Sequence, residues 1–304
     1  MKIRYDPALG VLGFIDGAHV RESSCMITAE EEKDILSRAY VPEHSVDLMT
    51  CVSGGEPFLI ENYFCIRKGD GIIVVGYPLQ CDFAVNEFQA VFDRIAERFR
   101  PKYASLIAPE LPLSLVASCS ERETDHYYTL DIHKAAARSG LRRIINKARG
   151  GLSVERSPRM GEEHHNLTLE FIERVKPPPR VSQLLLRMPE YVGHGRHSLA
   201  LNAWDKRENL AAFYIIDLAP KDFSTYVIGC YSEKHYTPGA SDLLLFELIQ
   251  ISMEYGKRYI HLGLGVNQGV QQFKKKWGGS PTRKYEMVEL ALRKPSLLDA
   301  IRAM

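Results

Sequence analysis

The chain has 304 residues, of which 45% are hydrophobic and 25% charged, and its formal net charge is +1. This length exceeds what one hydrophobic core usually organises, so we expect two domains of roughly 150 residues each. The small net charge excludes a protein that coats nucleic acid by bulk electrostatics, so any contact with a polyanion must be local. No window approaches the ~20 apolar residues of a membrane span, and Met1 to Pro7 carry no apolar run of signal-peptide length. We therefore predict a cytoplasmic protein without a membrane span.

Cysteine and histidine spacing gives no indication of a metal site. The six cysteines are far apart in the sequence and lack the paired C-x-x-C spacing of zinc or redox motifs. The pairs His164-His165 and His194/His197 have no companion cysteine or carboxylate in a recognisable pattern. We predict no metal ligands.

The first half of the chain alternates strand-like and helix-like segments. Residues 71–76 form a β-branched run typical of a buried strand, and 102–108 predict another. Between them, 86–99 carry apolar residues at three- and four-residue steps, which predicts an amphipathic helix ending before Pro101. A polar stretch follows at 121–128. We place a domain boundary between residues 127 and 128.

The second half opens with two helical pieces, separated by Ser139-Gly140 and ended by Gly150-Gly151. A helix beginning near Thr168 is interrupted by the proline run 177–179. Three strands are then expected at 197–204, 209–218 and 224–231. They precede an amphipathic helix at 241–255, a strand at 258–265 and a short helix at 270–277. Mixed alternation of this kind predicts an α+β fold in which sheets are flanked by helices.

Two blocks of the second half resemble the FemABX family of acyltransferases. The first block comprises Gly239-Ala240-Ser241 before the long helix, Gly256 after it, Leu262-Gly263 at a strand end, Gly269-Val270, Phe273-Lys274 and Trp277-Gly278. The second is Tyr128 to Ile132, followed by the R-x-x-I-x-x-A pattern within Leu141 to Ala148. The resemblance implies two tandem GNAT-like domains, 1–127 and 128–304, each with a mixed, mostly antiparallel sheet. It also implies direct transfer of an activated acyl or aminoacyl group to an amine, at a site in the second domain.

Lys274 is the residue that we expect to be catalytic. On a helix over 270–277 it shares one face with Val270, Phe273 and Trp277, whereas Lys275 and Lys276 point elsewhere. A lysine on an apolar face is costly unless it has an anionic partner or acts on a reacting group. The resemblance places this lysine in the acyl-transfer region, where its charge would stabilise the developing oxyanion. The alternative is that its stem packs while its ammonium reaches the surface.

We expect the donor to bind at Gly239, Ala240 and Ser241, where helix-entry amides favour an anion, together with Gly265 and Asn267. Residues 235–240 lack the initial Arg or Gln and the first glycine of the usual coenzyme A loop. We expect the acceptor to bind at Arg142, Arg143, Lys147 and Trp277, although such a basic stripe is often a solvated helix face. Candidate general bases are Asp131, His235, Tyr236 and His261.

No cofactor is expected to be permanently bound. The donor would be an acyl-coenzyme A or an aminoacyl-tRNA, and the acceptor a small-molecule or nucleotide-linked amine, with tRNA as a candidate partner. No Ser-His-Asp or Cys-His spacing indicates a covalent intermediate. Two other functions stay open. They are an acyl-coenzyme A-dependent N-acetyltransferase and a GNAT-like module that binds a ligand without catalysis. The sequence does not specify an oligomeric state.

Overall fold

A computed structural model describes residues 27–136 and 139–292; Met1 to Pro7 and Cys25 lie outside them. The strands are β1 (Glu56–Ile60), β2 (Tyr63–Lys68), β3 (Gly71–Val75), β4 (Tyr103–Ala108), β5 (Glu121–Asp131), β6 (Leu152–Ser157), β7 (Ser198–Asp205), β8 (Leu210–Asp217), β9 (Phe223–Tyr231), β10 (Tyr259–Leu264) and β11 (Ser280–Ala291). The helices are α1 (Ala29–Arg38), the short 3-10 helix η1 (Pro42–His44), α2 (Val46–Ser53), α3 (Val85–Phe99), α4 (Leu113–Ser118), α5 (Ile132–Ala136), α6 (Ser139–Arg149), α7 (Glu162–Val175), α8 (Pro179–His194), α9 (Ala240–Glu254) and α10 (Gln268–Trp277).

All these strands belong to one 11-stranded sheet, in the order β1-β2-β3-β4-β11-β5-β10-β9-β8-β7-β6. Neighbouring strands are antiparallel except in the pairs β3/β4 and β9/β10, which are parallel. The predicted α+β class, with mixed and mostly antiparallel pairing flanked by helices, is confirmed. The sheets of the two halves are joined edge to edge through the pair β5 and β11.

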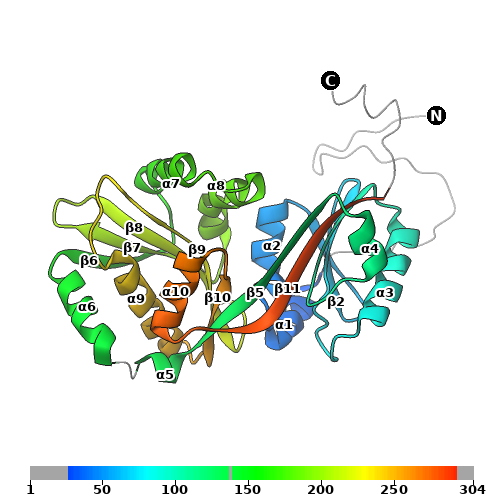
Figure 1. The fold of residues 1–304 in the computed structure, drawn as a ribbon, viewed down its shortest axis with the longest axis horizontal. Helices are drawn as coiled ribbons and strands as arrows, with labels where there is room; N and C mark the ends of the chain where they lie inside the picture. The colour runs from blue at the N-terminus through cyan, green and yellow to red at the C-terminus, as the bar shows by residue number, and fades with distance from the viewer. Residues whose placement is uncertain (1–26, 137–138, 293–304) are drawn as a thin grey trace, which may run out of the picture.

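Each half of the molecule contains one parallel pair with a connecting helix, β3-α3-β4 and β9-α9-β10. Between these units the halves exchange strands, because β11 pairs with β4 and β5 pairs with β10. Figure 1 shows β5 and β11 crossing the middle of the molecule side by side. The predicted boundary after residue 127 falls inside β5, and the division into two domains stays a prediction.

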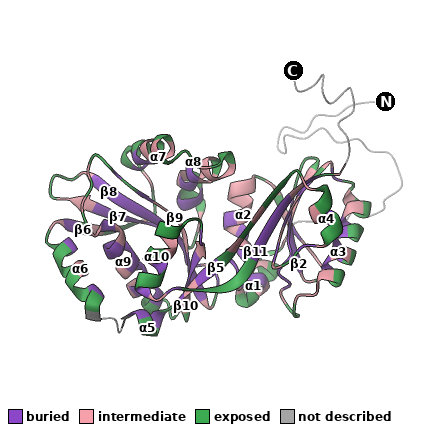
Figure 2. Cartoon of the chain, viewed as in Figure 1, coloured by how far each residue is buried: buried purple, intermediate pink, exposed green. Residues whose placement is uncertain are grey.

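Helices cover both faces of the sheet (Figures 1 and 2). On one face, α3 and α4 pack on the strands of the first half, and α5, α6, α9 and α10 on those of the second. On the other face lie α1 and α2, followed by α7 and α8, with α2 in contact with α8. Helix α9 is mostly buried, and all eight residues of β8 are buried. The second half is therefore packed on both faces.

Most predicted elements are confirmed within a residue or two. The apolar stripe of α3 is buried, and the proline run separates α7, which ends at Val175, from α8, which begins at Pro179. One prediction is wrong, because helix α7 begins at Glu162 rather than near Thr168. The polar stretch 121–128, for which no element was predicted, is part of strand β5, whose ladder with β11 overrides its low apolar content. None of the helices in the described ranges is both long and apolar enough to cross a membrane.

Candidate functional site

The carboxyl ends of β4 and β10 meet the same central part of β5 and β11. Ala108 at the end of β4 pairs with Glu286 of β11, which itself pairs with Thr124 of β5. Leu264 at the end of β10 pairs with Tyr127, three residues farther along β5. Ligands of sheets with parallel strands bind outside the carboxyl ends of those strands. The centre of the sheet is therefore the candidate site.

The parallel pair β9/β10 opens toward this centre. The two strands pair only from Phe223 to Thr225 and from Tyr259 to His261, although both continue beyond. Gly263 follows with a φ of +72°, a left-handed conformation that favours glycine. Backbone groups beyond His261 are thus released from the ladder between β9 and β10.

Lys274 lies at this open end. Its side chain is only 4% exposed, its Nζ donates a hydrogen bond to the carbonyl oxygen of Leu264, and it lies 5.5 Å from the centre of the Tyr128 ring. Burial lowers the pKa of Lys274 to about 8, and the negative charge of Asp125 partly opposes that shift. The predicted helix face is confirmed, since Lys275 and Lys276 are exposed. Neither of the two described cavities is lined by Lys274.

The loop before α10 is held against β5 by Asp125. Its Oδ2 accepts a hydrogen bond from the backbone N–H of Val266 at 2.8 Å. A Cβ at Gly265 would lie 2.7 Å from Oδ1 of Asp125, so a side chain there would displace the carboxylate. Val266 adopts a φ of +59°, which is strained for a β-branched residue. Asn267 caps α10 by accepting a hydrogen bond from Val270 N–H at 3.0 Å. The structure thus places Gly265 and Asn267 in the loop that leads into the helix of Lys274.

On the opposite face of the same strands lies a buried polar cluster that the sequence analysis did not anticipate. The ring of His261 contacts that of Tyr127 edge-on at 4.9 Å, and Tyr127 contacts Tyr77 at 5.8 Å and Tyr285 at 5.2 Å. His261 Nδ1 accepts a hydrogen bond from Gly263 N–H at 3.2 Å, whereas its Nε2 has no hydrogen-bond partner among the described residues. Strand alternation could have indicated this cluster, because Tyr127 must face away from Tyr128.

His261 is uncharged at neutral pH. Burial, together with the positive charges of Lys274 and Arg283, lowers its pKa to about 3. Beside the cluster, a cavity of about 660 Å³ opens at the end of β3, lined among others by Tyr40, Tyr77 and Arg283. The guanidinium of Arg283 lies 4.7 Å from the Tyr40 ring centre. His261 therefore lies in the electrostatic field of both Lys274 and the cationic residue of this cavity.

The other predicted general bases lie apart from this arrangement. Asp131 pairs with Lys134, and Tyr236 is 64% exposed and contacts Tyr231. His235 lies in the loop between β9 and α9, where its backbone N–H donates to Ser232. No described contact links these three to Lys274.

The predicted donor residues at the start of α9 are covered by α6. Gly239 has a φ of +86°, and a Cβ there would lie 3.1 Å from the Cβ of Ala148. Asp242 in the first turn of α9 is buried. It accepts a hydrogen bond from Trp277 Nε1 at 2.9 Å and forms an ion pair with Lys276. Gly239 therefore has a packing role. Donor binding by Gly239, Ala240 and Ser241 stays a prediction.

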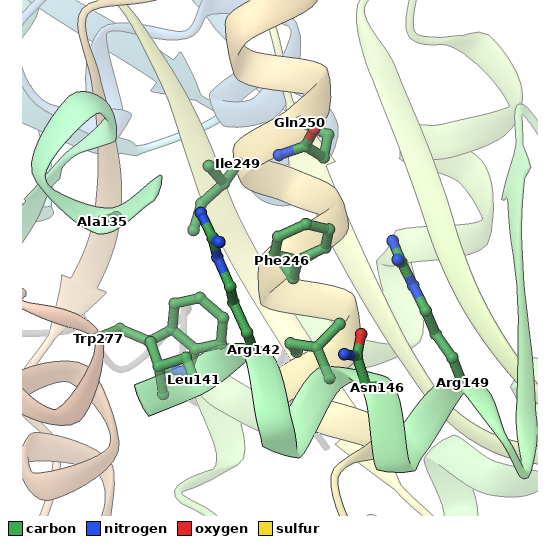
Figure 3. Close-up of a pocket in the computed structure, with 10 residues that line it drawn as sticks. Ala135, Leu141, Arg142, Asn146, Arg149, Phe246, Ile249, Gln250 and Trp277 are labelled. Atoms are coloured by element: carbon green, nitrogen blue, oxygen red, sulfur yellow. The ribbon is translucent and has the colours of Figure 1, made fainter. Parts of the chain in front are cut away.

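The structure separates the predicted acceptor residues into two groups. Arg142 and Trp277 line a cavity of about 350 Å³ between α6 and α9, shown in Figure 3. Arg143 and Lys147 are exposed on α6 and do not line it. Arg149, Asn146, Phe246 and Gln250 line the cavity and were not predicted. The R-x-x-x-N-x-x-R spacing was a signal for Asn146 and Arg149, since it places both on the helix face of Arg142.

No protein-family model and no curated protein matches this sequence. Solved structures do share its architecture. FemX has a TM-score of 0.58 at 10% identity, covering 84% of this chain and 94% of FemX. The C-terminal domain of a putative lysylphosphatidylglycerol synthetase from Agrobacterium fabrum has 0.56 at 17% identity, covering 85% and 90%. A tandem GNAT protein from the clavulanic acid biosynthesis pathway has 0.53 at 12% identity, covering 89% and 98%.

At these identities the similarity defines the fold, which is the tandem GNAT-like fold of FemX and its structural neighbours. The expectation drawn from the FemABX resemblance is thus confirmed for the architecture.

Proposed function

We propose that this protein is an acyltransferase that moves an activated acyl or aminoacyl group directly onto an amine. The observation that carries the proposal is the position of Lys274. Its buried side chain lies at the open end of β9/β10, where the strands of both halves converge. A buried ammonium is expensive to maintain, and perturbed charges of this kind concentrate at functional sites.

In this reaction the amine attacks the carbonyl carbon, the new C–N bond forms, and the bond from that carbon to the carrier breaks. The carrier leaves with the electron pair and takes up the proton that the amine gives up, directly or through water. Negative charge develops on the carbonyl oxygen, and the Lys274 ammonium, already fixed on the Leu264 carbonyl, supplies the opposing charge. One preorganised donor of this kind contributes about 3 kcal/mol, or roughly a hundredfold in rate.

The two candidate donors are an aminoacyl-tRNA and an acyl-coenzyme A, and the names of proteins with similar folds are compatible with each. The name of the Agrobacterium protein specifies a lysyl product, and the clavulanic acid pathway protein is described with reference to acetyl-coenzyme A. We propose Gly239, Ala240, Ser241, Gly265 and Asn267 for the donor and Arg142, Arg143, Lys147 and Trp277 for an amine acceptor, which can be nucleotide-linked.

A thermal-shift comparison with coenzyme A, acetyl-coenzyme A, charged tRNA and uncharged tRNA tests the donor, because a ligand of the native state raises apparent stability. Transfer is then measured with the stabilising donor in Lys274→Met and in Lys275→Met as the matched control. We expect a loss of about a hundredfold in Lys274→Met, with donor binding retained, and little change in the control. No stabilisation by any of the four, or equal turnover in both variants, would favour a non-catalytic ligand-binding module.

A further inference from the structure

The cavity at the end of β3 is enclosed by four separate segments. It is lined by Tyr40 after α1, by the loop 77–83 between β3 and α3, by Pro109 after β4, and by residues 282–284 of β11. Its volume, about 660 Å³, lies in the range of small-molecule sites. The cavity thus lies at the carboxyl ends of the parallel pair β3/β4, where sheets of this kind bind ligands. The same end of the other parallel pair, β9/β10, carries Lys274.

Hydrogen bonds between these segments fix the walls of the cavity. The Tyr40 hydroxyl donates to the carbonyl oxygen of Pro78 at 2.9 Å, and the Tyr77 hydroxyl donates to that of Lys284 at 2.6 Å. The buried His44 donates from Nε2 to the carbonyl oxygen of Tyr77 at 2.9 Å. Because both hydroxyl protons are donated to the protein, the two tyrosines offer the cavity mainly the surface of their rings. The cavity is therefore formed before any ligand enters.

Two side chains of opposite charge line the cavity, Arg283 on β11 and Asp82 in the loop after β3. The Arg283 guanidinium lies over the Tyr40 ring, 4.7 Å from its centre, which leaves the N–H groups at the edge of the stack. Burial raises the pKa of the Tyr40 hydroxyl, the charge of Arg283 opposes this rise, and that of Asp82 adds to it. Both charges therefore act at the same ring.

These two charges are not paired with each other. Within residues 27–136 and 139–292, neither Arg283 nor Asp82 forms an ion pair, although both lie at one cavity. A guanidinium edge matches the two oxygens of a carboxylate, and a carboxylate matches an ammonium. A ligand that carries both a carboxylate and an ammonium would pair both side chains at once.

The remaining lining is apolar. Pro78 and Pro109 are buried, whereas Leu79 and Phe83 are only half-buried and line the cavity from the loop after β3. Covering such partly exposed side chains with an apolar group of a ligand removes further apolar surface from water. The cavity thus combines one cation, one anion and an apolar wall.

We infer that this cavity binds a free amino acid with an apolar side chain. Arg283 binds its carboxylate, Asp82 binds its ammonium, and Leu79 and Phe83 contact its side chain. None of these four residues is among those proposed for the acyl donor, the amine acceptor or the catalytic lysine. Occupancy of this second site therefore does not depend on acyl transfer.

Isothermal titration of the full chain with L-leucine tests this site, with N-acetyl-L-leucine and L-leucine amide as ligands that each lack one charge. We expect L-leucine to bind more tightly than either. Arg283→Gln should weaken L-leucine and N-acetyl-L-leucine by about tenfold or more and leave the amide unchanged, because only the first two carry the carboxylate. Asp82→Asn should weaken L-leucine and the amide and leave N-acetyl-L-leucine unchanged.

The controls are Arg207→Gln and Glu208→Gln, which remove one exposed charge of each sign in the turn between β7 and β8. Figure 1 shows these strands at the end of the molecule opposite α3, so both variants should leave the affinity for L-leucine within about twofold. The proposal is overturned if L-leucine does not bind at millimolar concentration or if either derivative binds as tightly as L-leucine. It is also overturned if Arg283→Gln and Asp82→Asn weaken all three ligands equally.

Discussion

Asp125 of β5 accepts a hydrogen bond from the backbone N–H of Val266 at 2.8 Å, although the two residues are 141 positions apart in the sequence. The same carboxylate favours the charged form of Lys274. It thus holds the loop that precedes α10 in a strained conformation and supports the charge on that helix. The conformation of the loop at Val266 and the protonation of Lys274 therefore both depend on the Asp125 carboxylate.

Val266→Gly should stabilise the protein. A β-branched residue at a φ of +59° is strained by roughly 1–2 kcal/mol, and its side chain is 73% exposed, so little packing is lost. After the greater entropy of an unfolded glycine is subtracted, a gain of about 1 kcal/mol remains, measured as a shift in the urea midpoint. Val175→Gly, at an exposed helix position, should instead lose about 1 kcal/mol. A loss of stability in Val266→Gly would show that Asp125 and the loop do not impose strain.

Acyl transfer should decline as the pH rises above about 8. The pKa of Lys274 is lowered to about 8, so most of the side chain is protonated below that pH and most of it is neutral above it. Asp125→Asn removes the charge that favours the ammonium, so the decline in kcat/KM should begin at lower pH in this variant. The measurement is the pH profile of kcat/KM with the donor identified by thermal shift. Because the acceptor amine also loses a proton in this range, the difference between the profiles of Asp125→Asn and the parent protein is the readout. Identical profiles would contradict a requirement for the Lys274 ammonium.

Two buried histidines should make the protein sensitive to acid. Burial lowers the pKa of His261 to about 3 and that of His44 to about 4, from 6.5 in an unfolded chain. Between pH 6.5 and these values the unfolded chain binds protons that the folded chain does not, so stability falls as the pH falls. His261→Phe should flatten this dependence by up to one proton, measured by urea unfolding between pH 7 and 4.

Burial also raises the pKa of the Glu43 and Asp217 carboxyls, which by itself would make stability rise as the pH falls. The contribution of His261 is therefore obtained by comparing variants. His133→Phe, at an exposed position, serves as the control and should leave the slope unchanged. If His261→Phe has the same slope as the parent protein, His261 is protonated in the folded chain.

Gly239→Ala should destabilise the protein by about 1–2 kcal/mol. The backbone φ of +86° disfavours any side chain, and the new Cβ would lie 3.1 Å from that of Ala148 on α6. Gly140→Ala is the matched control, because nothing lies within 4 Å of a Cβ there, and alanine favours the helix. Both are measured by chemical denaturation. Equal stability of Gly239→Ala and the parent would contradict close packing of α6 on the start of α9.

Local patterns predicted individual elements well. The three- and four-residue apolar steps of α3 specify a helix because one face must be buried, and the proline run specifies where α7 and α8 separate. The burial of Lys274 beside exposed Lys275 followed from helical periodicity alone. No strand was predicted at 121–128 because the first six of these residues are polar. The strand is stabilised by its ladders with β11 and β10.

The sequence by itself determined β3, α3 and β4 in the first half, the run from β7 to α10 in the second, the face of α10 that carries Lys274, and the resemblance that led to a tandem GNAT-like fold. These properties depend on side-chain periodicity and on local backbone preferences, which a single segment contains. Only the tertiary structure decided that β5 and β11 are exchanged between the halves, that Tyr127 packs against His261 on the face of β5 opposite Lys274, and that α6 covers Gly239. Those contacts join residues more than 90 positions apart, and their energy arises from packing and electrostatics between segments that no local pattern encodes.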